Sequence, residues 1–223
     1  MSRKLGPGIV DRMSLAMSMS RHVDGIRIGS FLGSQDYVAR VEDALLLIKQ
    51  HSPLHYSRIM RELERIWIWL VPHGLAHYDR SLKACVLDER FVADSATGLE
   101  QIASAIVHEA THARLERCGI AYNENRRARI EAICFRRELA LAARLPDGAE
   151  LQGDIAQYLD RYQNNPEYFR DVHWRERISK GQIETLRYLK APEWLIRALL
   201  TLKSMIDRTR RMFSTDRPPV GSG

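Results

Sequence analysis

The fold is decided by the stretch Thr97-Gly-Leu-Glu-Gln-Ile-Ala-Ser-Ala-Ile-Val-His-Glu-Ala-Thr-His-Ala-Arg-Leu-Glu-Arg-Cys-Gly119. It opens on a capping box, in which the side chain of Thr97 accepts the amide of Glu100 and the glutamate reaches back to the amide of Thr97. Apolar residues then recur at helical spacing. Gly119 tolerates the left-handed conformation just past a helix, so the pattern predicts a helix that ends at Cys118.

Two histidines inside this helix predict a metal site. His108 and His112 are four residues apart, so they lie on one helix face and can bind one ion. Zinc binds neutral histidine nitrogens in tetrahedral geometry, and a catalytic zinc site keeps one position for water. Glu109 is expected beside that water as the general base. The alternative is a surface helix that carries two histidines and a glutamate by chance.

A third protein ligand is expected from the next helix, predicted from Asn123 to about Arg144. Eighteen residues separate His112 from Glu131, which stands about two turns into that helix. The turn between the two helices is short enough to make them antiparallel neighbours, so Glu131 is predicted to complete the ligand set. Its alternative role is an ion pair with a neighbouring arginine. The rival ligands are Glu116, Glu124 and Glu138.

The motif His108-Glu-Ala-Thr-His112 followed by Glu131 resembles the gluzincin metallopeptidases, the clan of thermolysin and aminopeptidase N. The stretch Ile130-Glu-Ala-Ile-Cys-Phe135 is similar to the second-helix signature of the ImmA/IrrE-type minimal metallopeptidases. The resemblance covers roughly residues 54–146. It implies a zincin-like domain with strands ahead of the first helix, zinc on the three predicted ligands, and Glu109 as the catalytic base.

The sequence departs from the gluzincin pattern at two points. It has no aminopeptidase exopeptidase motif, and Phe135 stands four residues after Glu131, where thermolysin-type enzymes have an aspartate. The group that supports the metal ligands must therefore come from elsewhere.

A peptidase also needs a group that stabilises the oxyanion. Tyr162 and His173 are our predictions, ahead of Tyr158 and Tyr168, although a helical tyrosine is more often half-buried core with its hydroxyl at the surface. By analogy, the predicted strand at residues 84–87 could be an edge strand that pairs with an extended peptide.

The rest of the chain is expected to form one α+β, helix-rich domain over residues 35–213, with a small sheet ahead of the motif helix and a helical C-terminal part. Residues 1–34 are predicted to be a loosely ordered segment without function, and residues 214–223 a flexible tail. The expected elements are helices at 35–52 and 54–65, strands at 66–71 and 84–87 with Phe91-Val92 close behind, a loop at 72–77, and three or four helices after Leu151, the last from Glu193 to about Phe213.

Composition excludes several classes of protein. The chain has 223 residues, 45% of them hydrophobic and 28% charged, which suits a soluble globular protein. Residues 1–30 and 203–223 each carry five basic and two acidic residues, and these tails account for the whole net charge of +6. The neutral body makes nucleic-acid binding an unfavoured function. No apolar stretch approaches the roughly 20 residues of a membrane span.

The three cysteines form neither a disulfide framework nor a CxxC pair, and no signal peptide is recognisable, so a cytoplasmic location is predicted.

Four other features are given structural interpretations. His73 and His77 are assigned to a loop, where a spacing of four does not bring side chains together. Trp67 and Trp69 are assigned to a buried strand, and the arginines of the second helix to a solvated face. The last helix is amphipathic; docking on the protein core or on a second subunit is favoured over an anionic membrane.

These observations predict a zinc-dependent metallopeptidase that acts on a peptide or protein substrate. The alternative is a zinc-stabilised protein, catalytically inactive, that serves interaction or associates with nucleic acid. Glu109 favours the enzyme, because a structural zinc site normally has four protein ligands and no carboxylate beside an open position.

Overall fold

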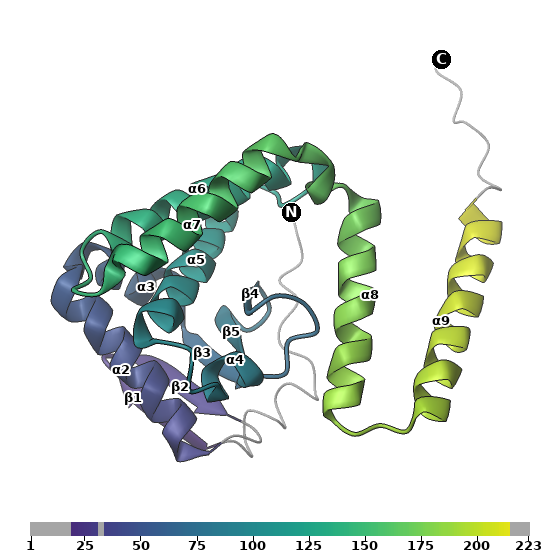
Figure 1. Ribbon diagram of the computed structural model, residues 1–223, viewed down its shortest axis with the longest axis horizontal. Coiled ribbons are helices and arrows are strands. Elements are labelled where there is room, and N and C mark those ends of the chain that lie inside the picture. The colour runs from purple at the N-terminus through teal and green to yellow at the C-terminus, as the bar shows by residue number, and fades with distance from the viewer. Residues whose placement is uncertain (1–18, 31–33, 215–223) are drawn as a thin grey trace.

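The computed structural model describes residues 19–30 and 34–214 (Figure 1). Its architecture is α+β and rich in helices, with a small mixed sheet that precedes most of the helices in the chain, as predicted. The predictions for residues 1–18, 31–33 and 215–223 lie outside the described residues.

The sheet has five strands in the order β1-β2-β3-β5-β4. The β1–β2 and β5–β4 pairs are antiparallel, whereas β3 pairs in parallel with both β2 and β5. The strands are β1 (Met19–Val23), β2 (Ile26–Ser30), β3 (Arg65–Trp69), β4 (Ala76–Asp79) and β5 (Ala84–Asp88).

The hairpin of β1 and β2 corrects the expectation of a loosely ordered segment at residues 1–34 for the part that the structure describes, residues 19–30. Asp24 and Gly25 both have positive φ, 48° and 99°, as a two-residue type I′ turn requires. Ile26 and Ile28 are buried in the main core. The Asp24-Gly25 pair was the local signal for this hairpin. The hairpin joins the sheet through the pairing of β2 with β3.

The prediction that residues 84–87 form an edge strand is also wrong. Residues 84–87 belong to β5, which lies between β3 and β4 and is buried along its whole length. The strand at this edge of the sheet is β4, in a segment predicted to be a loop because Pro72 and Gly74 precede it. β4 pairs only with β5 among the described residues.

Helices predicted from apolar periodicity are confirmed. They are α2 (Gln35–His51), α3 (Pro53–Glu62), α5 (Leu99–Arg117), α6 (Glu124–Ala142), α7 (Gly148–Asn164), α8 (Asp171–Tyr188) and α9 (Glu193–Ser214), with a short 3-10 turn, η1 (Pro166–Phe169). Phe91 and Val92, expected with the strands, lie in a short helix instead, α4 (Glu89–Ala93). The side chain of Asp88 caps this helix by accepting the amide of Arg90 at 2.8 Å.

The helix start at the quoted stretch is shifted by one residue. Gly98, not Thr97, is the N-cap, and the side chain of Gln101 accepts the Gly98 amide at 2.8 Å. The carbonyl of Thr97 accepts a hydrogen bond from Arg40 of α2. The end of the helix is as predicted, since Gly119 has φ 78° directly after the cap Cys118.

Helix α5 lies at the centre of the molecule, in contact with α2, α3, α6, β4 and β5. Ile102, Ile106 and Ala110 are buried in the main core. Helix α6 lies along α5, and α7 packs against α6 (Figure 1). The motif helix is therefore held from several sides, which fixes the position of the side chains that it carries.

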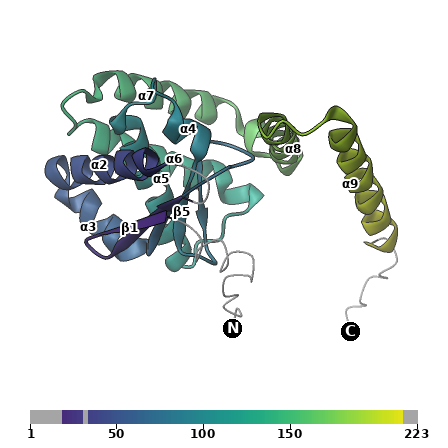
Figure 2. The same ribbon diagram turned by 90° about the horizontal axis from the view of Figure 1, so that it is seen from below.

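The last two helices lie outside this body. Figures 1 and 2 show α8 beside the sheet and α9 standing apart from α2–α7. The apolar side of α9 is not docked on the protein core: Trp194, Leu202 and Met205 are exposed. No helix within the described ranges is long and apolar enough to cross a membrane.

Candidate metal centre

The three predicted metal ligands converge in the structure. The Nε2 atoms of His108 and His112, one turn apart on α5, are 3.1 Å from each other. The carboxylate of Glu131 reaches them from α6, with Oε2 3.2 Å from His108 Nε2 and Oε1 3.5 Å from His112 Nε2. The three side chains are only 13–16% exposed.

These separations fit a single zinc ion. Zinc binds histidine nitrogen and carboxylate oxygen at about 2.0–2.2 Å, so two ligand atoms of a tetrahedral site are about 3.3 Å apart. The observed ligand-to-ligand distances of 3.1, 3.2 and 3.5 Å lie close to this value. The donor set of two imidazoles and one carboxylate is also one that zinc accepts.

Glu138 supports the first histidine. Its Oε1 accepts a hydrogen bond from Nδ1 of His108 at 2.5 Å, and its Oε2 accepts one from the hydroxyl of Ser104 at 2.6 Å. Glu138 is two turns after Glu131 on α6 and is buried. A proton held on Nδ1 leaves the Nε2 lone pair directed at the cluster, as metal-binding histidines require.

The electrostatics of the metal-free cluster differ between the two histidines. Burial lowers the pKa of His108, but the nearby Cys134, Glu138 and Glu131 outweigh it and hold the pKa well above its usual range. Burial, followed by the charge of His108, lowers the pKa of His112 to about 4. Burial raises the pKa of Glu131, but its hydrogen bond with His108 and the histidine charges lower it to about 2. Without a metal, these shifts favour the protonated form of His108, the neutral form of His112 and the ionised form of Glu131.

Glu109, the predicted general base, is buried on α5 and its carboxylate accepts the backbone amide of Tyr78 in β4. Burial raises the pKa of Glu109 to about 7, against the opposing effects of His108 and of the Tyr78 amide. A carboxyl group with a pKa near neutrality can both accept and return a proton at physiological pH.

Cys134 is a ligand candidate that sequence reasoning missed. Its Sγ and one nitrogen each of His108 and His112 all lie within 4.8 Å of one another. Burial raises the pKa of the thiol well above its usual range, which favours the protonated form when no metal is present. The signal in the sequence was its position three residues after Glu131, on the same helix face.

Tyr122, in the turn between α5 and α6, covers the cluster. Its hydroxyl donates a hydrogen bond of 2.6 Å to Oε1 of Glu131, and its ring lies edge-on to His112 with centroids 5.4 Å apart. The guanidinium of Arg127 lies 5.4 Å from the Tyr122 ring and 5.0 Å from the ring of Trp174 on α8. No sequence pattern pointed to these residues, because they meet only through the packing of α6 against α8 and η1.

Of the two predicted oxyanion residues, Tyr162 lies closer to the metal ligands than His173 can be shown to lie by any described contact. Tyr162 is half-buried among aromatic rings, with its centroid 5.4 Å from Phe135, whose ring in turn is 5.2 Å from His108. It therefore lies one ring away from the ligands. His173 is half exposed on α8 and its Nδ1 is 3.4 Å from Glu176, while the adjacent Trp174 is the residue that faces Tyr122.

His73 and His77 are closer together than predicted. His77 lies in β4, and the two rings stack with centroids 6.2 Å apart. Neither belongs to a cluster of three potential metal ligands among the described residues. Trp67 packs in a second apolar cluster with Val86, which confirms its interpretation as part of a buried strand.

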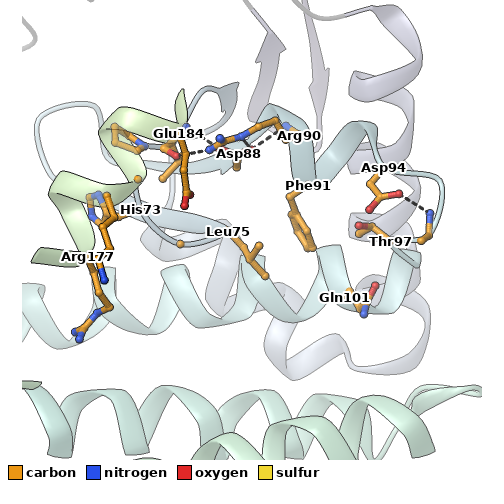
Figure 3. Close-up of a pocket in the computed structure, with 16 residues that line it drawn as sticks. His73, Leu75, Asp88, Arg90, Phe91, Asp94, Thr97, Gln101, Arg177 and Glu184 are labelled. Atoms are coloured by element: carbon orange, nitrogen blue, oxygen red, sulfur yellow. Dashed lines mark hydrogen bonds and ion pairs between the residues drawn. The ribbon is translucent and has the colours of Figure 1, made fainter. Parts of the chain in front are cut away.

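A cavity of about 690 Å³ lies between α8, α4 and the segment that leads into β4. Figure 3 shows Leu75 and Glu184 directed into it, and Arg177 at its side. None of the three predicted metal ligands lines this cavity. His73, at one wall, contacts Trp174 with ring centroids 5.6 Å apart, and Trp174 is the link from the cavity to Tyr122 and the cluster.

The chain matches no model of a known protein family, no curated protein and no solved structure.

Proposed function

We propose that this protein is a zinc-dependent metallopeptidase of the gluzincin type, with a zincin-like fold, that hydrolyses peptide bonds in a peptide or protein. The observation that carries this proposal is the convergence of His108, His112 and Glu131 at tetrahedral ligand spacing, beside the buried carboxylate of Glu109.

Each residue has a stated role in this proposal. His108, His112 and Glu131 would hold the zinc ion, and Glu138 orients His108 through Nδ1. When bound, zinc supplies Lewis-acid polarisation of the scissile carbonyl and lowers the pKa of water. Glu109 accepts a proton from the attacking water and passes it to the departing amine. Among the described residues β4 pairs with no strand other than β5. The Tyr78 amide is bonded to Glu109, and the other main-chain groups on the outer edge of β4 would align an extended substrate by hydrogen bonds.

The three cysteines, all free thiols, support a reducing compartment, so we place the reaction in the cytoplasm.

The experiment that tests the proposal compares the wild-type protein with Glu109→Gln. Both are purified without chelator, zinc per chain is measured, and a mixed peptide library is incubated with each and read by mass spectrometry. The expected result is about one zinc in both proteins and cleavage only by the wild type, because glutamine keeps the shape of the side chain but cannot accept the proton. Equal cleavage by both proteins would exclude Glu109 as the base.

Cys134 favours a second candidate function. The ligand atoms of His108, His112 and Cys134 lie within 4.8 Å of one another. If the Cys134 thiol bound the ion together with Glu131 and the two histidines, the ion would have four protein ligands and no open position, as in structural zinc sites. The protein would then be a zinc-stabilised interaction protein without turnover. This candidate would be favoured if the wild type binds about one zinc per chain and cleaves no peptide in the library.

A further inference from the structure

Helix α9 carries an apolar face whose large side chains are exposed. Trp194, Ala198, Leu202 and Met205 follow one another at spacings of four, four and three residues, which places them on one side of a helix. Trp194 is 70% exposed, Leu202 55% and Met205 59%. We name these four residues the α9 apolar face.

On the opposite side of the helix one apolar residue is buried. Ile196 is 2% exposed, although it stands only two residues after Trp194. Ile196 is therefore sheltered near the start of the helix, whereas the α9 apolar face is exposed. Figures 1 and 2 agree that α9 stands apart from α2–α7, so these helices do not cover the α9 apolar face. A contiguous run of large exposed apolar side chains marks a surface that meets another apolar phase.

Charge distinguishes the possible occupants of this face. Residues 193–214 contain five basic and two acidic residues. A second copy of the helix would bring two surfaces of like charge together, which is unfavourable. Anionic lipid headgroups carry the complementary charge, and tryptophan has a preference for the boundary between headgroups and acyl chains.

We propose that α9 binds the surface of an anionic lipid bilayer, with its axis in the membrane plane and the α9 apolar face in the boundary between headgroups and acyl chains. The helix lies on the membrane and does not span it, in agreement with its many charges. This proposal is independent of the metallopeptidase function, since it uses none of the residues of the metal centre.

The test is flotation of the full chain with vesicles of phosphatidylcholine mixed with phosphatidylglycerol, and with vesicles of phosphatidylcholine alone. We expect binding to the anionic vesicles that falls as salt is added, and little binding to the neutral ones. Leu202→Glu places a carboxylate in the apolar face and should weaken binding about tenfold or more.

Leu200→Glu is the matched control. Leu200 is 39% exposed and two residues from Leu202, so the same substitution falls on the opposite side of the helix and should change binding far less. Circular dichroism of both variants checks that the helices are kept. Equal losses in the two variants, equal binding to neutral and anionic vesicles, or no binding would each overturn the proposal. So would a dimer in lipid-free solution that Leu202→Glu dissociates, which would assign the face to a second copy of the chain.

Discussion

Glu138 holds His108 by a hydrogen bond of 2.5 Å between Oε1 and Nδ1. In the proposed metallopeptidase, this contact would do the work of the aspartate that the gluzincin pattern has where Phe135 stands. The phenylalanine at position 135 requires such a group to come from elsewhere in the chain. Glu138 was predicted only as a rival zinc ligand. The structure puts the carboxylate on the far side of the imidazole from the Glu131 carboxylate, which suits an orienting role.

Replacement of Glu138 by glutamine should weaken zinc binding about 10–100-fold, the usual cost of losing an outer partner of a metal-binding histidine. The amide cannot accept the Nδ1 proton as strongly as the carboxylate. Competition with a chromophoric chelator measures the affinity. Ser104→Ala is the control, because it removes the other partner of Glu138 and leaves the contact with His108 in place; unchanged affinity in Glu138→Gln would contradict the orienting role.

Substitutions at Glu131 and Cys134 should separate the two possible ligand sets. If Glu131 is the third ligand, Glu131→Gln reduces zinc affinity by more than the roughly 10–100-fold expected for an outer partner, whereas Cys134→Ser leaves zinc content unchanged. Cobalt substitution provides an independent measurement, since a thiolate ligand gives a sulfur-to-metal absorption band. That band in the wild type, lost in Cys134→Ser, would make Cys134 a ligand.

Zinc affinity should fall as the pH is lowered. In the metal-free protein the pKa of His108 is raised, so at neutral pH the imidazole carries a proton that zinc must displace. Below that pKa each pH unit lowers the affinity about tenfold, because one proton competes with the ion. The pKa of His112 is lowered to about 4, so a second proton competes only near that pH.

The measurement is a chelator competition from about pH 8 to about pH 5, corrected for protonation of the chelator. Glu138→Gln should flatten the curve, because Glu138 is one of the groups that raise the pKa of His108. A wild-type affinity that does not change over this range would rule out His108 as a ligand that must lose a proton.

Gly181 sets the distance between α8 and the segment before β4. A Cβ at this position would lie 1.5 Å from the carbonyl oxygen of Pro72. Gly181→Ala should therefore push the helix away and lower the free energy of unfolding by roughly 1–3 kcal/mol, the usual cost of overpacking. Thermal unfolding followed by tryptophan fluorescence measures the change.

Gly153→Ala is the control for the intrinsic effect of alanine in a helix. Gly153 lies in α7 and a Cβ there meets nothing within 4 Å, so the substitution should stabilise the protein by up to about 1 kcal/mol. Equal effects of the two substitutions would show that the close approach of Gly181 to Pro72 is not maintained in solution.

The sequence by itself determined the helices and the order of the site residues along them. Periodicity over long segments predicted α2, α5 and α6, and the four-residue spacing of His108 and His112 required them to share a helix face, since both features follow from local backbone geometry. Glu131 could be predicted from the sequence because the short turn after Gly119 forces α6 to lie against α5.

Only the tertiary structure decided which strand forms the edge of the sheet and which residues surround the ligands. β4 is short and polar, so it becomes a strand through pairing with β5 and not through its own propensity. Tyr122, Cys134 and Glu138 reach the two histidines through the packing of α6 and its preceding turn on α5, and Trp174 joins them from α8. Such contacts depend on helix packing and side-chain direction, which spacing along one chain does not specify.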